Sequence, residues 1–516
     1  MREENIRYNV IVHPQVICDV ANLSCGRCQL PFFGSIAQRT IMICTCERKP
    51  ISRRNFFSWS GSGLGALALA CVNQSSSNLA KATESPSSKR TDFAPRVKRV
   101  IWLFMHGGPS HVDLFDPKPE LEKLAGQTLP DSFGDVLTRR KVAKNPLLPS
   151  IRKFQARGNS GIEISDFLPE IAACADDLCL IRSMHGDSVN HPQAVYQTNT
   201  GSVLMGRPST GSWVAYGLGS ENQDLPAFVV LPDPGGGLKG GPPAWGSGFL
   251  PATYQGITMR PGPKPILNLR TQESLSEIGQ RPALDLIQRM NQRHMQARDD
   301  DDELAARIDS YELAFRMQAA APDLVDLKDE SQETLGLYGI DNKVTQEFGH
   351  RCLLARRMVE RGVRFVQVHS GNTNGWDAHS DIEENHSKMC AATDRPVAGL
   401  LRDLKRRGLW DDTLVIWGGE FGRMPMSESK TGRDHNPWGY TVWLAGGGIK
   451  GGMAHGATDA VGLRALEKPV HIRNFHATLL HLLGLDPNAL SYLHNGLDER
   501  LIGPTNDVEI VWEILA

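Results

Sequence analysis

Residues 394–422 read Asp394-Arg-Pro-Val-Ala-Gly-Leu-Leu-Arg-Asp-Leu-Lys-Arg-Arg-Gly-Leu-Trp-Asp-Asp-Thr413-Leu-Val-Ile-Trp-Gly-Gly-Glu420-Phe-Gly422. Apolar residues recur at helical spacing over 394–407, whereas 413–417 is an apolar run typical of a strand buried on both faces. A strand of that kind lies in a sheet that is covered by helices on both sides. This segment therefore predicts an α/β fold, and Glu420 follows its strand directly.

The same two patterns recur along much of the chain. Apolar runs that predict further strands are 97–105, 178–181, 227–231, 363–368 and 441–444, and helical patterns cover 167–175, 346–361 and 472–483. Strands that alternate with helices predict a mostly parallel central sheet with helices on both faces.

The composition is that of a globular protein. The 516 residues are 40% hydrophobic and 22% charged, which is ordinary for a soluble domain. The 56 basic and 58 acidic residues leave a net charge of −2. Because this balance provides no basic footprint, we expect no nucleic-acid partner.

A targeting segment is indicated near the N-terminus. Ser52-Arg53-Arg54-Asn55-Phe56-Phe57 precedes a weakly apolar, Gly- and Ala-rich run over 58–71, which is too short to span a bilayer. This pattern resembles the twin-arginine export signal. The resemblance implies that the twin-arginine export machinery is a partner and that the protein is exported to the periplasm, the cell surface or the medium.

The limits of this segment follow from its context. Met42 would give the signal peptide, residues 42–82, an ordinary start, so residues 1–41 read as an extended gene start. Ala80-Lys81-Ala82 offers a small-x-small cleavage site. Leu67-Ala-Leu-Ala-Cys71 is similar to a lipobox, and a lipid anchor at Cys71 and a free mature protein both stay open.

Beyond the signal, we expect one large domain. Residues 83–96 read as a linker, residues 97–498 as the α/β domain and residues 499–516 as a C-terminal tail. Within the domain, residues 271–331 read as a polar helical insertion. The acidic run 299–303 lacks the glycine and the spacing of a calcium loop and is more typical of a solvated helix start.

Potential metal ligands follow several of the predicted strands. In open parallel sheets, ligands bind beyond the carboxyl ends of the strands, so these loops can converge. Imidazole and carboxylate groups are ligands that borderline divalent cations take, although the same residues also serve as caps and turns. Asp377 and His379 form the sharpest pair, since an extended loop sends both side chains to one face. The candidate ligands are His106, Asp377, His379, Glu420, Asp434 and His435.

Four motifs together resemble one known family. They are His106-Gly-Gly-Pro-Ser-His111, Trp376-Asp-Ala-His379, Gly419-Glu-Phe-Gly-Arg423 and Gly432-Arg-Asp-His-Asn-Pro437. They resemble the exported family catalogued as domain of unknown function 1501, which is counted in the alkaline phosphatase and sulfatase-like superfamily. The resemblance runs from Val97 to about Leu485. It implies an alkaline phosphatase-like three-layer fold and a hydrolase of phosphate, sulfate or related anionic esters, with polymeric substrates included. It also implies a divalent metal ion, zinc or calcium.

The departures from the sulfatase pattern limit the chemistry. His106 and Gly107 stand where sulfatases have two metal-binding aspartates, and Glu420-Phe421 replaces an Asp-His or Asp-Asn pair. Asn190 stands where sulfatases carry the Cys or Ser that becomes formylglycine, so formylglycine chemistry is excluded. We expect a metal-activated water as nucleophile. We also expect Phe421 to face away from the site into the core.

Three functions are open at this stage. In a metal-dependent hydrolase, His191 or Arg423 would bind the anionic substrate or stabilise developing charge. A non-catalytic periplasmic or surface binding protein on the same scaffold is the alternative, because fold does not imply function. A metal-free serine hydrolase would use Ser110 with His111 and Asp113, but no nucleophile-elbow motif supports it.

Overall fold

The computed structural model describes residues 91–260, 277–296, 302–505 and 507–516, all within one compact unit, Thr83–Ala516. The expected signal peptide, the gene start at 1–41 and Cys71 lie outside the described residues. Within the described residues, no helix combines the length and the apolar character needed to cross a bilayer.

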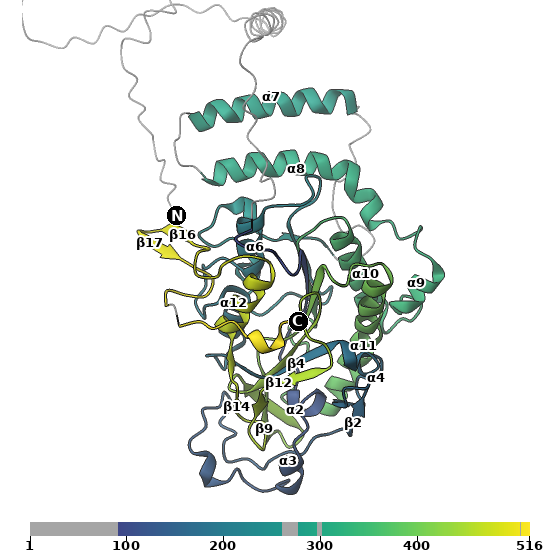
Figure 1. The fold of residues 1–516 in the computed structure, drawn as a ribbon, viewed down its shortest axis with the longest axis vertical. Coiled ribbons are helices and arrows are strands. Elements are labelled where there is room, and N and C mark those ends of the chain that lie inside the picture. The colour runs from purple at the N-terminus through teal and green to yellow at the C-terminus, as the bar shows by residue number, and fades with distance from the viewer. Residues whose placement is uncertain (1–90, 261–276, 297–301, 506) are drawn as a thin grey trace, which may run out of the picture. The chain divides into compact units, whose positions relative to one another are not determined.

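One nine-stranded sheet dominates the described part of the chain (Figure 1). Its strand order is β12 (Met453–His455), β4 (Leu178–His185), β11 (Tyr440–Gly446), β8 (Thr413–Gly418), β1 (Arg99–Met105), β7 (Phe365–Ser370), β5 (Phe228–Leu231) and β6 (Ile257–Thr258), and β15 (Val470–His471) also pairs with β4. Only β11 pairs antiparallel within this sheet, with β4 on one side and β8 on the other. The mostly parallel sheet expected from the sequence is therefore confirmed.

Strand β1 shows why the sheet is buried on both faces. Ile101, Leu103 and Met105 belong to one hydrophobic cluster, and the alternating residues Val100 and Trp102 belong to another. This alternation follows from the two-residue period of a strand.

Each cluster is closed by its own helices, which gives three layers. The first cluster includes residues of α4 (Pro169–Ala172), α10 (Gln346–Glu360) and α11 (Ile382–Arg406). The second includes residues of α5 (His191–Thr200), α6 (Thr210–Leu218) and α12 (Ile472–Leu482). The helices expected on both faces of the sheet are therefore present.

The remaining elements are short or peripheral. Helices α7 (Glu277–Gln296) and α8 (Asp302–Val325) run side by side, so the described part of the predicted insertion is helical (Figure 1). The other helices are α2 (His111–Leu114), α3 (Pro119–Lys123) and α9 (Gln332–Leu337), and 3-10 turns cover Asp131–Phe133, Ala175–Asp177, Pro242–Trp245, Ala252–Tyr254 and Trp512–Ile514. Small hairpins pair β2 (Phe154–Arg157) with β3 (Ile162–Ser165), β9 (Gly422–Glu428) with β10 (Gly432–Asn436), β13 (Ala457–Thr458) with β14 (Ala465–Glu467), and β16 (Tyr492–His494) with β17 (Leu497–Glu499).

All six predicted strands form, but two helix boundaries differ. Helix α11 begins at Ile382, earlier than the expected 394, because Ile382 and Cys390 extend its buried side through a mostly polar sequence. Helix α4 is shorter than the expected 167–175, since it begins at Pro169 and gives way to a 3-10 turn at Ala175.

Candidate metal centre

The candidate ligands lie at the edge of the sheet where the parallel strands end. Strand β11 runs antiparallel to its neighbours, so its beginning lies at this same edge. His106 follows β1, Asp377 and His379 lie in the loop after β7, Glu420 lies just after β8, His191 opens α5, and His435 lies on β10 before β11.

A glycine brings the loop after β7 against the end of β1. Gly107 has a φ of +111°, and a Cβ at this position would lie 2.5 Å from the Asp377 nitrogen and 2.7 Å from the Trp376 nitrogen. A residue with a side chain would therefore be strained and would push this loop away. The Trp376 N–H donates to the His106 carbonyl at 2.9 Å, which fixes the loop and with it Asp377.

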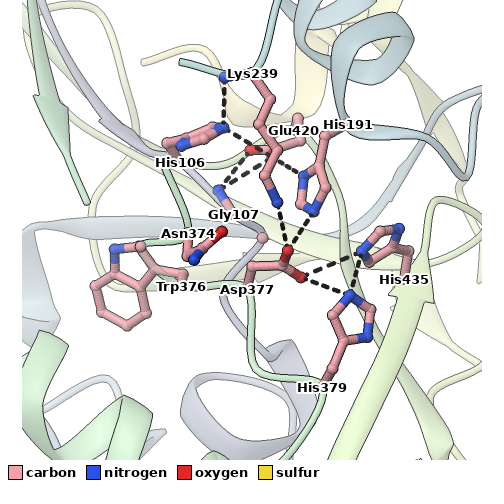
Figure 2. Close-up of polar contacts among 12 residues, drawn as sticks. His106, Gly107, His191, Lys239, Asn374, Trp376, Asp377, His379, Glu420 and His435 are labelled. Carbon is pink, nitrogen blue, oxygen red and sulfur yellow. Dashed lines mark hydrogen bonds and ion pairs between the residues drawn. The ribbon is translucent and has the colours of Figure 1, made fainter. Parts of the chain in front are cut away.

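Three imidazoles surround the Asp377 carboxylate (Figure 2). His379 Nε2 lies 3.0 Å and His435 Nε2 lies 3.2 Å from Asp377 Oδ1, and His191 Nε2 lies 3.0 Å from Oδ2. The ligand atoms of these four residues lie within 4.8 Å of one another. The predicted convergence of Asp377, His379 and His435 is thus present in the structure, and His191 joins them.

Hydrogen bonds at Nδ1 set the tautomers of two of the imidazoles. His435 Nδ1 lies 2.6 Å from the Val189 carbonyl oxygen, and His379 Nδ1 lies 2.6 Å from Glu428 Oε2. A carbonyl and an ionised carboxylate can only accept, so each Nδ1 carries a proton, and in the neutral form of each ring Nε2 presents a lone pair. Partners of this kind orient imidazoles that ligate metals.

Glu420 does the same for the third imidazole. Its Oε1 accepts from His191 Nδ1 at 2.6 Å, and the Gly107 N–H donates to its two oxygens at 3.0 and 3.1 Å. Burial alone would raise the pKa of Glu420, but nearby His106 and the contact with His191 lower it to about 2. Glu420 is therefore a carboxylate that holds His191, with Nε2 of that ring directed at Asp377.

The potential ligand atoms lie close together. His379 Nε2 and His435 Nε2 are 3.1 Å apart. Buried His191 Nε2 has no hydrogen-bond partner despite its distance to Asp377. In a tetrahedral zinc site, neighbouring ligand atoms are roughly 3.3 Å apart, since metal–nitrogen distances are about 2.0 Å. The donor set therefore fits a divalent cation in both spacing and charge.

The protonation states at the centre agree with this interpretation. Burial lowers the pKa of His435 to about 3, and Arg423 contributes to the lowering, so the ring is neutral near neutral pH. Burial would raise the pKa of Asp377, but its contacts with the imidazoles and with Arg423 hold it far below the ordinary value. Asp377 is thus ionised near neutral pH.

Arg423 contacts Asp377 and the backbone around it, whereas the sequence predicted a contact with the substrate or with developing charge. It is fully buried, and its donors go to the carbonyl oxygens of Gly107, Gly108 and Arg433 and to Asp377 Oδ1, the last at 2.7 Å. All of its nitrogens are engaged within the protein. Arg423 therefore holds Asp377 in place, and its substrate contact stays a prediction.

His106 points toward the site but is occupied by other partners. Its Nδ1 lies 3.1 Å from the Asn372 carbonyl oxygen, so Nδ1 donates, and Nε2 accepts the Lys239 backbone N–H at 3.0 Å. His106, His191 and Glu420 form a second group of closely spaced ligand atoms. Both ring nitrogens of His106 have partners within the protein, so it anchors the Lys239 backbone beside the site, and its role as a metal ligand stays a prediction.

Asp434 and Ser110 lie in other networks. Asp434 accepts hydrogen bonds from the backbone N–H groups of Arg140 and His435 at 2.6 and 2.8 Å. Its potential ligand atom lies within 4.8 Å of those of His379 and Glu428. The Ser110 hydroxyl donates to an oxygen of Asp113 that is ion-paired with a buried arginine. Its hydroxyl is thus held by a structural ion pair.

His111 completes the argument against a serine triad. Its Nε2 lies 2.8 Å from the Gly462 carbonyl oxygen, whereas the Ser110 hydroxyl donates to Asp113. A triad requires the imidazole to accept the proton of the nucleophilic hydroxyl. The described geometry of Ser110, His111 and Asp113 does not provide this contact.

Phe421 corrects another expectation. It is 1% exposed, as expected, but its ring lies against the site and does not face away from it. The ring centroid is 4.5 Å from that of His435, with the planes 25° apart, and 4.8 Å from that of His191. The apolar residue beside Glu420 is therefore the surface on which two imidazoles pack.

The centre opens into a basic cleft of about 210 Å³. Its walls include the four clustered residues together with Arg139, Arg140, Asn190, Pro192 and Lys239. Asn190 caps α5, so the positive end of that helix dipole also faces the cleft. Three side-chain cations and a helix N-terminus make this cleft suited to an anion.

Sequence reasoning missed Lys239 and the two partners Glu428 and Val189. Lys239 follows the predicted strand 227–231 within a glycine-rich loop, so the rule that sites lie beyond strand ends could have found it. No pattern in the sequence around Glu428 or Val189 indicates their role. That role depends on the positions of the His379 and His435 rings, which come from other segments.

Comparisons with known proteins place the chain in a family and among structures of related fold. Residues 97–514 match a family model described as "Protein of unknown function (DUF1501)". No curated protein matches the chain. Similar solved structures include a sulfatase from Pseudoalteromonas sp., 13% identical, covering 89% of this chain and 78% of that chain with a TM-score of 0.33.

Two further structures have comparable scores. Alkaline phosphatase from the Antarctic bacterium TAB5 is 11% identical, covering 76% of this chain and 100% of that chain with a TM-score of 0.33. A protein in the alkaline phosphatase superfamily from Vibrio parahaemolyticus is 12% identical, covering 85% and 77% with a TM-score of 0.31.

Proposed function

The chain belongs to the family described as protein of unknown function (DUF1501), and we propose that it is a metal-dependent hydrolase of anionic esters. Phosphate and sulfate esters are the substrate classes. The observation that carries the proposal is the convergence of three imidazole Nε2 atoms on the Asp377 carboxylate, at the bottom of a basic cleft.

Zinc is the cation that this donor set favours. Three nitrogen donors and one carboxylate suit zinc or a similar transition metal, whereas calcium takes six to eight oxygen ligands. His191, His379, His435 and Asp377 would hold the ion. A cation held there would act as a Lewis acid toward an ester oxygen and would make water a better nucleophile.

The cleft supports an anionic substrate. Arg139 and Arg140 are exposed on one wall, and Lys239 reaches the centre from another segment. Their charges and the N-terminus of α5 would bind the anionic group and place the ester bond at the centre. The substrate can be polymeric, because the cleft is open to solvent.

The attacking group is water in this proposal. Among the described residues that line the cleft, none carries a hydroxyl or a thiol. This supports direct attack by water and argues against a covalent intermediate on the protein. The same observation favours a second candidate function, a periplasmic or surface binding protein that has the cleft and the cation but catalyses no hydrolysis.

Metal analysis and ester hydrolysis test the proposal. Purified protein should contain zinc near one ion per chain, and it should hydrolyse p-nitrophenyl phosphate, p-nitrophenyl sulfate or bis(p-nitrophenyl) phosphate. Asp377→Asn should lose both metal and activity, whereas His350→Ala, a half-buried histidine on α10, should keep both. Protein that holds zinc but hydrolyses none of the esters supports the binding protein, and protein that holds no cation overturns both functions.

Export by the twin-arginine machinery is a separate proposal. It rests on Arg53-Arg54 and the weakly apolar run that follows them. That route carries folded proteins, which suits a protein that acquires its metal before export.

A further inference from the structure

Lys239 forms an ion pair with Asp377, the carboxylate that a cation at this centre would need as a ligand. Its Nζ lies 2.5 Å from Asp377 Oδ2, which is also the oxygen 3.0 Å from His191 Nε2 (Figure 2). The ammonium therefore sits beside one of the nitrogen donors, on the ligand face of Asp377. An ammonium and a divalent cation cannot both be close partners of the same oxygen without strong repulsion.

The backbone of Lys239 is fixed, but its side chain is not. The backbone N–H donates to His106 Nε2 at 3.0 Å, and His106 is itself held by the Asn372 carbonyl. The Lys239 side chain is 23% exposed and lines the cleft together with Arg139 and Arg140. Because only the backbone is anchored, rotation about the side-chain bonds of Lys239 can move its ammonium group from Asp377 into the cleft.

We propose that Lys239 is an exchangeable counterion: it pairs with Asp377 until a divalent cation binds, and it then becomes the ligand of a tetrahedral oxyanion in the cleft. This inference rests on the proposed metal centre and adds the identity of the substrate-binding cation. Phosphate and sulfate groups share the chemistry that an ammonium and two guanidinium groups would recognise. No bond is made or broken in the exchange.

The exchange predicts opposite effects on two ligands. Removing the ammonium takes one unit charge away from the metal position, so zinc should bind Lys239→Met on the order of ten to a hundred times more tightly than wild type. Inorganic phosphate and sulfate should bind the zinc-loaded variant about tenfold more weakly, since one charge-assisted contact is lost.

Calorimetric titration tests both effects. Zinc alone is titrated into wild type, Lys239→Met, Lys239→Arg and Arg139→Met, and phosphate and sulfate are then titrated into each zinc-loaded protein. Lys239→Arg should stay close to wild type, because it keeps the charge. Arg139→Met removes an exposed cation from the cleft wall without touching Asp377, so it should weaken oxyanion binding and leave zinc affinity unchanged.

The outcomes separate this inference from the proposed function. If Lys239→Met binds zinc no more tightly than wild type, the exchange is refuted while the metal centre stands. If the variant binds phosphate and sulfate as well as wild type does, Lys239 is not the oxyanion ligand. If none of the four proteins binds zinc, the metal centre and the exchange both fall.

Discussion

Glu428→Gln should weaken metal binding without removing a metal ligand. Glu428 accepts the Nδ1 proton of His379 at 2.6 Å, and its side chain is only 14% exposed. A glutamine can still accept through its oxygen, but it can also donate to Nδ1 and so shift the proton to Nε2, which abolishes the lone pair at the metal position. The variant therefore samples a tautomer that cannot bind a cation.

The expected size follows from the lost charge-assisted hydrogen bond. Such a bond contributes about 1.5–3 kcal/mol, and partners that orient metal-bound imidazoles typically account for about 10–100-fold in affinity. We expect zinc to bind Glu428→Gln within that range of weakening, with the stoichiometry unchanged. Glu428→Leu, which cannot accept at all, should be weaker still.

Zinc titration in competition with a chelator measures the change, and thermal unfolding checks that the variants are folded. Glu383→Gln is the matched control, because Glu383 pairs with Arg152 in an ion pair whose carboxylate is 47% exposed and lies outside the centre. Equal zinc affinity in Glu428→Gln and wild type would refute the claim that Glu428 sets the tautomer of His379.

Three further predictions concern stability and export. Phe421→Ala should lower the free energy of unfolding by about 3–5 kcal/mol in urea, because a ring that is 1% exposed is removed; an effect under about 1 kcal/mol would mean that the ring is not packed on the imidazoles. Burial lowers the pKa values of His386 and His476 to about 3 and about 4, so the unfolded chain binds more protons below pH 6.5. Stability is therefore fully present above pH 6.5 and falls by roughly 1.4 kcal/mol per pH unit for each group as the pH drops toward those values. Thermal unfolding should show this slope, and His476→Gln should reduce it. Replacing Arg53-Arg54 by Lys-Lys should keep the precursor in the cytoplasm by fractionation, and normal secretion would contradict the twin-arginine interpretation.

The sequence predicts the sheet well, because buried parallel strands leave a strong signal. Runs such as 363–368 and 413–417 are apolar throughout, and the positions of the loops after them follow from the fold alone. This rule predicts that Asp377, His379 and His435 lie close together, and the structure brings them together. The rule that ligands bind beyond the carboxyl ends of parallel strands predicts the edge of the sheet where the side chains lie. It does not predict the hydrogen-bond partner of each side chain.

The remaining parts of the site depend on hydrogen bonds between distant segments. His106 and Lys239 are far apart in sequence, and only the folded chain shows that a backbone N–H takes the lone pair of His106. The position of Phe421 was misjudged for a related reason. An apolar residue in a polar motif indicates burial, but burial against a core and burial against imidazoles look the same in sequence.

The replaced motif residues make sense when they are considered together. Where the sulfatase pattern has oxygen ligands, His106 anchors the Lys239 backbone, Glu420 orients His191, and Phe421 supports two imidazole rings. All three have partners within the protein. The donors come instead from Asp377 and three imidazole nitrogens.

At the proposed metal centre, these replacements would change which cation is preferred. A centre built from carboxylates suits hard cations, whereas one carboxylate among three imidazoles suits zinc and carries one negative charge in place of several. A single carboxylate would not neutralise a bound divalent cation, so the proposed centre would carry a net positive charge. Arg423 and Lys239, which both pair with Asp377, add to this positive charge. An anionic ester group is the ligand that this excess would attract, so these replacements would favour binding of an oxyanion at the proposed centre.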